Sequence, residues 1–125
     1  MTIPKWIKPL FTFAGLYDFI LGALFVLAPI NIFVLVGVEP PNHIGYIQFP
    51  ALLLVVFGIM FFAIARDPEA NRNLIPYGIL LKISYCTVVF SHAATRTIPD
   101  MWIPFAWIDV LFLAAFIAAI RALKQ

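Results

Sequence analysis

Three ionisable side chains stand inside long apolar runs of this 125-residue chain: Asp18, Lys82 and Asp109. If those runs are buried in a bilayer, each ionised group costs about 2.5–3.5 kcal/mol, and the three together cost roughly 8–10 kcal/mol. Buried charges are tolerated when opposite charges pair and neutralise one another. We therefore predict that all three side chains face the interior of a helical bundle, with Lys82 between the two carboxylates.

The formal charge of this cluster does not cancel. Two carboxylates and one ammonium sum to −1, and an interior site should not keep an uncompensated charge. Either one aspartate carries a proton at neutral pH, or a bound cation or amine completes the site. The residues are thus predicted to form a ligand site or a proton-exchanging site. Two other interpretations stay open: a buried latch that fixes helix register without chemistry, and pairing with a membrane helix of a partner subunit. A dry, sealed cluster would contradict both site interpretations and leave the latch.

The composition identifies the elements that must position these charges. Hydrophobic residues make up 64% of the chain and charged residues 11%, against roughly 45–50% and about 25% in ordinary soluble domains. The mean hydropathy is +1.04. These values exclude a soluble globular domain, a disordered chain and a nucleic-acid binder. Because a spanning helix takes about 20 apolar residues, we predict an all-α, polytopic membrane protein: one membrane domain over residues 1–125, built as a four-transmembrane-helix bundle.

Prolines and capping residues set the expected helix boundaries. Pro29 ends the first helix, Asn73 and Asp100 are candidate N-caps of the third and fourth, and Pro50 and Pro104 are candidate kinks, with a late helix start as the alternative at Pro50. The apolar stretch after Pro29 is too short to span, so it is expected to lie in the membrane interface or to cap the bundle. The predicted helices cover residues 9–28, 44–65, 74–92 and 101–120.

With these boundaries, each of the three charges lies within about two residues of its helix midpoint, which is ~3 Å along the axis. Small residues share the same helix faces and would let the helices approach closely. These small residues are Ala14, Gly15, Gly22, Gly78 and Ala106.

Other polar residues offer weaker signals. Gln48, Tyr17 and Tyr85 are candidates for a secondary polar lining, although Gln48 could instead hydrogen-bond across helices. His43 and His92 lie near one side of the predicted membrane, but no third ligand stands at motif spacing, so we predict no metal site. No cofactor is predicted either, with quinone or haem as the alternatives. The single cysteine, Cys86, leaves no disulfide or redox pair and is expected to be a packing residue.

The basic residues outside the apolar runs are distributed unequally between the two sides of the predicted membrane. One side carries six of them and the other carries only Arg96. By the positive-inside rule, both termini are predicted to be cytoplasmic, in a multi-pass protein of the inner (plasma) membrane. The six are Lys5, Lys8, Arg66, Arg72, Arg121 and Lys124.

Short motifs give the chain a resemblance to a known group. A Gly-x-Tyr-Asp sequence ends at Asp18, an Arg-Asp-Pro turn follows the second predicted helix, and a tryptophan precedes Asp109 on the way into the fourth. In these features the chain resembles the broad DoxX-like group of small four-helix bacterial membrane proteins. The resemblance implies a small subunit of a membrane oxidoreductase assembly, working near quinone or thiol chemistry. The chain lacks the cysteine pair that thiol chemistry would use, and no site residue follows from the resemblance.

Taken together, the residues predict a small integral inner-membrane protein without catalysis of its own. It would act as an accessory subunit or as a binder of a lipophilic ligand, through the cluster of Asp18, Lys82 and Asp109. The alternative is a proton-coupled carrier or a quinone-reactive subunit of a membrane oxidoreductase. Its expected partners are the lipid bilayer and either copies of itself or a larger membrane complex, with no nucleic acid.

Overall fold

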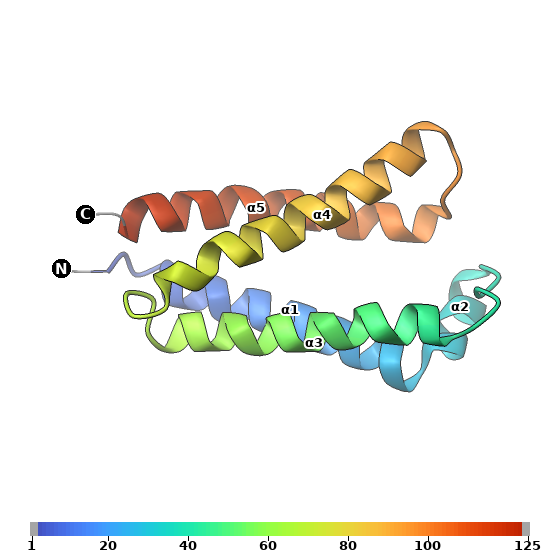
Figure 1. Cartoon of the computed structure of the whole chain (residues 1–125), viewed down its shortest axis with the longest axis horizontal. Helices are drawn as coiled ribbons and strands as arrows, with labels where there is room; N and C mark the ends of the chain where they lie inside the picture. Colours follow the sequence, from blue (N-terminus) through green and yellow to red (C-terminus); the bar gives the residue numbers. More distant parts are fainter. Residues whose placement is uncertain (1–2, 124–125) are drawn as a thin grey trace.

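The fold is described by a computed structural model covering residues 3–123. Within this range the chain forms five α-helices and no strand, which confirms the all-α prediction (Figure 1). Four of the helices are long and apolar enough to cross a membrane, as expected of a multi-pass membrane protein. The helices are α1 (Ile7–Leu27), α2 (Pro29–Val36), α3 (Gly45–Arg66), α4 (Ile75–Ala94) and α5 (Ile103–Leu123), with 3-10 turns η1 (Arg72–Leu74) and η2 (Asp100–Trp102) before α4 and α5.

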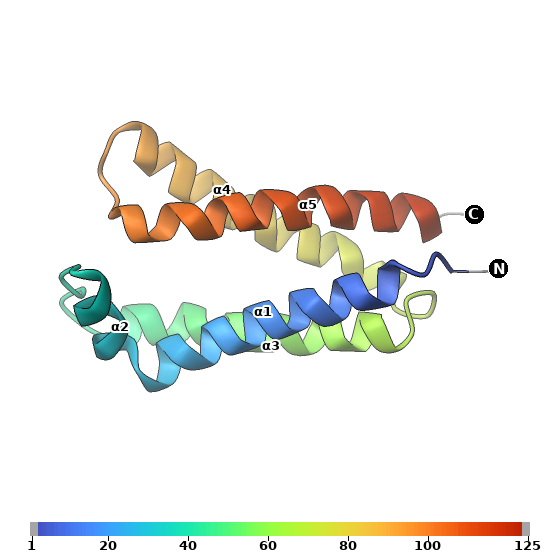
Figure 2. The same ribbon diagram turned by 180° about the vertical axis from the view of Figure 1, so that it is seen from behind.

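The four long helices form two pairs. Helix α1 packs along α3 and α4 packs along α5, whereas contacts between the pairs are few (Figures 1 and 2). Glycines bring α1 and α3 together: a Cβ atom added at Gly58 would lie 2.9 Å from the backbone nitrogen of Phe19 and 3.0 Å from the carbonyl oxygen of Gly15. A Cβ at Gly22 would collide with the carbonyl oxygen of Ala51. Small residues on α1 thus allow close helix packing, as predicted, and α3 is the helix they meet.

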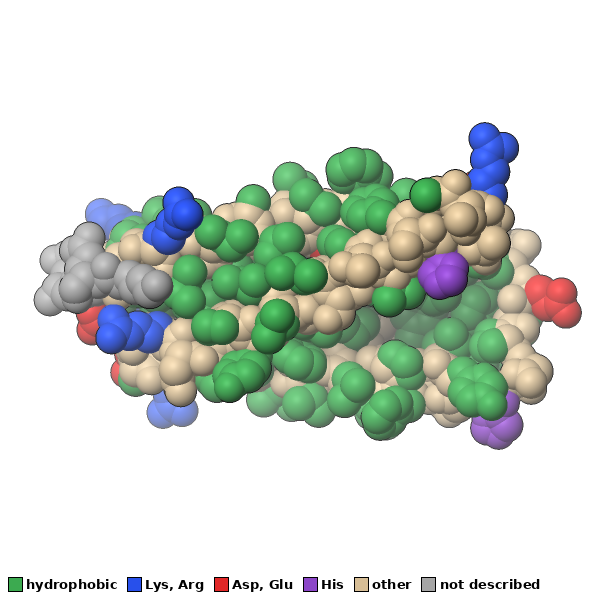
Figure 3. Space-filling model, turned by 45° about the horizontal axis from the view of Figure 1, so that its top comes forward, with side chains coloured by type: hydrophobic (Ala, Val, Ile, Leu, Met, Phe, Trp, Pro, Cys, Tyr) green, Lys and Arg blue, Asp and Glu red, His purple; other side chains and the backbone are tan. Residues whose placement is uncertain are grey.

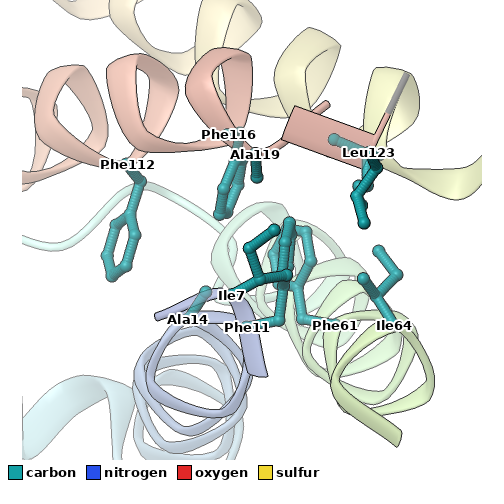
Figure 4. Close-up of a cluster of buried hydrophobic side chains, with 10 residues drawn as sticks. Ile7, Phe11, Ala14, Phe61, Ile64, Phe112, Phe116, Ala119 and Leu123 are labelled. Atoms are coloured by element: carbon teal, nitrogen blue, oxygen red, sulfur yellow. The ribbon is translucent and has the colours of Figure 1, made fainter. Parts of the chain in front are cut away.

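An aromatic core fills the bundle at the end that carries both chain termini, which we call the terminal half. Phe11 of α1 stacks on Phe116 of α5 with ring centroids 4.9 Å apart, and Phe61 of α3 lies 5.1 Å from Phe116. All three are fully buried. Figure 4 shows these side chains pointing toward one another from three helices. In this half the two helix pairs are therefore joined by direct side-chain packing.

The short helix α2 covers the opposite end, which we call the α2 half. Its one buried aromatic residue, Phe33, lies 6.3 Å from Phe25 of α1 and 6.1 Å from Trp102 of η2 between ring centroids. The stretch after Pro29 thus caps the bundle, one of the two roles expected of it. Gly37 ends the helix at φ +70°, in the left-handed region that glycine adopts without steric cost.

Two predicted N-caps are wrong. Asn73 lies inside η1 and Asp100 is the first residue of η2, and neither side chain caps a helix. The 3-10 turns satisfy the first backbone N–H groups of α4 and α5 instead, because the N–H of Ile75 donates to the carbonyl oxygen of Arg72 and that of Ile103 donates to the carbonyl oxygen of Asp100. Backbone turns of this kind replace side-chain caps at helix ends.

Of the two candidate kinks, only Pro50 lies in the interior of a helix. Pro104 is the second residue of α5, where its missing N–H would have had no helical partner, so it does not interrupt the helix. Pro50 lies inside α3, which already begins at Gly45. The late helix start considered for Pro50 is therefore wrong.

Basic side chains gather at the end that carries both chain termini (Figure 3). The loop after α3 belongs to this end, since the guanidinium of Arg72 donates to the carbonyl oxygen of Leu123, at the end of α5, at 2.9 Å. Arg96 follows α4 at the other end. Lys124 lies outside the described residues.

Candidate functional site

The three predicted charges meet in one buried cluster that joins α1, α4 and α5. The Lys82 ammonium donates to Asp18 Oδ1 and Oδ2 at 2.9 and 3.1 Å and to Asp109 Oδ1 at 3.0 Å. The side chains of Asp18 and Lys82 are 1% exposed, whereas that of Asp109 is 10% exposed. The position of Lys82 between the two carboxylates is as predicted. Asp109 is the member of the cluster that is least covered.

Aromatic rings enclose the ammonium on its remaining sides. Its nitrogen lies 5.1 Å from the ring centroid of Phe112, 5.6 Å from that of Tyr17 and 5.8 Å from that of Phe61. Rings at such distances attract a cation through their electron-rich faces. Phe112 and Phe61 belong to the core of the terminal half, so the cluster is sealed on that side by packed hydrocarbon.

A cavity of about 480 Å³ begins on the other side of the cluster and extends through the α2 half. Both aspartates lie in its wall, and apolar side chains from α1, α3, α4 and α5 form most of the rest. The volume falls in the usual range of small-molecule sites, roughly 300–1,000 Å³. Among the residues that line it are Leu21, Ala51, Leu81, Phe105 and Trp102.

The cavity opens sideways between α3 and α4. Leu53 of α3 and Val88 of α4 both line it and are 42% and 54% exposed. Figure 3 shows the surface hollowed beside α4 in the α2 half. At the α2 end, by contrast, Trp102 packs against Phe25 at 5.5 Å and against Phe33 at 6.1 Å between ring centroids. The open side is a surface that would face lipid acyl chains, and we call it the α3–α4 portal.

Most polar groups in the cavity wall already have partners. Ser84 Oγ donates to the carbonyl oxygen of Leu80 at 2.7 Å, and Tyr85 Oη donates to that of Trp102 at 2.9 Å. Two oxygens near the cluster are left over. Among residues 3–123, the hydrogen bonds of Asp109 engage only Oδ1, and the buried Tyr17 Oη has no hydrogen-bond partner. Because Asp109 lines the cavity, its free oxygen is available to a bound molecule.

Tyr17 and Tyr85, proposed as secondary lining, are part of the cavity wall. Gln48 is not: its side-chain nitrogen donates across helices to the carbonyl oxygen of Val26 at 3.2 Å. Cys86 packs against α5, with Sγ 3.4 Å from the carbonyl oxygen of Ala106.

The histidines make only local contacts. His43 Nδ1 accepts from the backbone N–H of Gly45 at 3.0 Å, and His92 Nδ1 lies 3.0 Å from Thr97 Oγ1. The described part of the chain contains no group of three or more potential metal ligands.

These features define a class: a multi-pass helical membrane protein in which a buried ion cluster forms the end wall of an apolar cavity. Comparison with family models, with curated proteins and with solved structures finds no match to the chain. The resemblance to the DoxX-like group stays a prediction.

Proposed function

We propose that this protein binds a lipophilic ligand without transforming it, and that the ligand enters from the bilayer through the α3–α4 portal. The observation that carries the proposal is the cavity that ends on Asp18 and Asp109. An apolar body with a few polar groups at one end is the usual make-up of a ligand site. The protein would act as an accessory subunit that holds such a ligand within the membrane, alone, with copies of itself or in a larger complex.

The same proposal places the protein in the inner (plasma) membrane with both termini in the cytoplasm. The support is the gathering of basic residues at the terminal end, with Arg96 at the other. Positively charged loops are retained on the cytoplasmic side. The cavity and its portal would then lie in the outer half of the bilayer.

Blocking the cavity tests the binding function. Val88→Trp places an indole in the cavity wall, while Val56→Trp makes the same change on α3, at a position that is 59% exposed and does not line the cavity. The wild-type protein and both variants would be purified in a mild detergent and examined by native mass spectrometry for retained small molecules. We expect a retained compound in wild type and Val56→Trp, and at least about tenfold lower occupancy in Val88→Trp. Equal retention in the two variants, or none in the wild type, contradicts the proposal.

A second candidate function is a proton-coupled carrier or quinone-reactive subunit. It is favoured by one observation: the cluster has one carboxylate more than its ammonium neutralises, and the unengaged oxygen of Asp109 lies at the cavity. Such a carboxylate could exchange a proton with a bound quinol or a transported solute. The resemblance to the DoxX-like group also supports a quinone-reactive subunit. Ligand binding would then change the number of bound protons, which a pH-indicator dye in weak buffer can detect, and Asp109→Asn would abolish the change.

A further inference from the structure

The polarity of the cluster indicates which ligands the cavity favours. The Lys82 ammonium is directed at the two carboxylates, since it contacts both oxygens of Asp18 and one of Asp109. Aromatic rings surround its remaining sides. When both carboxylates are ionised, the single ammonium leaves one negative charge uncompensated. That charge is least covered at Asp109, whose second oxygen is unengaged and whose side chain keeps 10% exposure.

The cavity wall contains no basic side chain that could neutralise this charge, among the described residues that line it. A buried carboxylate without a partner is costly. A ligand that brings a positive charge would remove this cost, whereas an anionic ligand would add to it. Charge complementarity therefore favours a cation.

Aromatic side chains in the cavity wall also favour a positively charged ligand. Tyr17, Tyr85 and Phe105 line the cavity, with Phe25 and Trp102 toward the α2 end. Their faces attract organic cations. Tyr17 also offers a buried hydroxyl oxygen that has no partner among residues 3–123 and can accept a hydrogen bond. The remainder of the wall is hydrocarbon, which suits an apolar body.

We propose that the ligand is a lipophilic amine that binds as its ammonium ion. The ammonium donates hydrogen bonds to Oδ2 of Asp109 and to Oη of Tyr17, and the hydrocarbon or aryl body fills the cavity toward Phe25. This inference rests on the proposed binding function and specifies the chemical class of its ligand.

Quenching of Trp102 tests the inference, because this tryptophan lines the cavity. Trp6→Phe and Trp107→Phe would leave it as the only tryptophan, and the full chain would be placed in phosphatidylcholine nanodiscs. The probes are three 11-bromoundecyl compounds, the amine, the alcohol and the carboxylic acid, whose bromine quenches a nearby indole. With concentrations expressed as mole fractions in the bilayer, we expect the amine to half-saturate the cavity at a concentration at least about tenfold lower than the alcohol does. The reason is that the ammonium ion adds a charge–charge attraction to Asp109 that the neutral hydroxyl lacks. The acid should bind most weakly.

Two variants and a control identify the side chains that bind the ammonium of the probe. In Asp109→Asn, the half-saturation concentration of the amine should come to within about threefold of that of the alcohol. Asp100→Asn, which removes a carboxylate at the start of η2, should leave the preference for the amine unchanged. Tyr17→Phe keeps the ion cluster and removes only the hydroxyl. It should weaken amine binding by about tenfold or more, because the hydrogen bond that is lost has a charged donor.

The outcomes separate the two levels of the proposal. If none of the three probes quenches Trp102, the binding function itself is overturned, and the amine inference with it. If the alcohol or the acid binds as tightly as the amine, the amine inference is overturned while the binding function stands. The inference is also overturned if the amine preference survives in Asp109→Asn. Should that variant fail to fold, a folded Tyr17→Phe protein with unchanged amine binding overturns it as well.

Discussion

The terminal half and the α2 half of the bundle are built from the same four long helices and fill their interiors differently. In the terminal half, Phe11, Phe61 and Phe116 meet at the centre and join the two helix pairs. In the α2 half, the pairs are separated by a cavity of about 480 Å³. The ion cluster lies at the boundary, with packed rings on one side and open volume on the other.

This difference bears on the role of the cluster. A latch that only fixed helix register would be best served by hydrocarbon on every side, because water or lipid headgroups next to an ion pair weaken it. Phe61 and Phe112 provide such cover in the terminal half, and the α2 half leaves Asp109 partly open. The contrast favours a site that uses the terminal half as its rigid base.

The largest effect is expected at the boundary itself. Lys82→Met leaves two buried carboxylates without a partner, and breaking a buried ion pair costs about 3–5 kcal/mol. The free energy of unfolding, measured in mixed micelles by denaturing-detergent titration, should fall by this amount. Arg96→Met, which removes an exposed charge, is the control and should change it little. Full stability in Lys82→Met would show that the cluster contributes nothing to the fold.

The two halves should differ in their response to the loss of an aromatic ring. Phe116→Ala opens a cavity in the closed core and should cost about 3–5 kcal/mol. Phe105→Ala, on the same helix, enlarges a cavity that already exists and should cost distinctly less, about 1 kcal/mol. Thermal unfolding of the two variants gives the comparison directly. Similar losses would mean that the α2 half is packed as firmly as the terminal half.

A smaller effect is expected at the contact between α1 and α3. Gly22→Ala introduces a Cβ that meets the carbonyl oxygen of Ala51, so α1 and α3 must separate at a cost of about 1–3 kcal/mol. Gly45→Ala is the control, since its added Cβ would meet only the side chain of His43, at 3.0 Å and beyond. Equal stability of the two variants would contradict the close backbone contact.

The smallest effect is expected at the end of α2. Gly37 has φ +70° and open space around it, so Gly37→Ala costs only the backbone strain, about 1 kcal/mol. The loss should be local to the α2 cap. Hydrogen exchange should therefore rise in residues 29–37 and stay unchanged in the terminal half. Faster exchange throughout the bundle would mean that α2 stabilises the whole fold.

The lengths of the apolar runs were sufficient to predict the four long helices, whose ends fall within about three residues of their expected places. The cost of burying charge was sufficient to predict that Asp18, Lys82 and Asp109 meet. Both predictions rest on the bilayer as solvent, which imposes strong constraints on backbone and charge.

The cavity and the pairing of the helices could not be predicted in the same way. Lipid-facing and interior side chains of a membrane helix are equally apolar, so hydropathy does not tell a filled interior from a hollow one. On α5 the signal was present but weak: Phe112 and Phe116 follow Asp109 at helical spacing, and the small Ala106 precedes it. The caps at Asn73 and Asp100 failed because backbone turns can supply the same hydrogen bonds.

The α3–α4 portal determines how occupancy of the cavity should be measured. A cavity that opens toward acyl chains and is covered by α2 at its end exchanges its contents with the bilayer, so water is not its reservoir. Occupancy then depends on the mole fraction of ligand among the lipids, and phospholipid acyl chains are the competitors it must displace. Adding empty vesicles would strip a ligand from the protein more effectively than dilution into buffer.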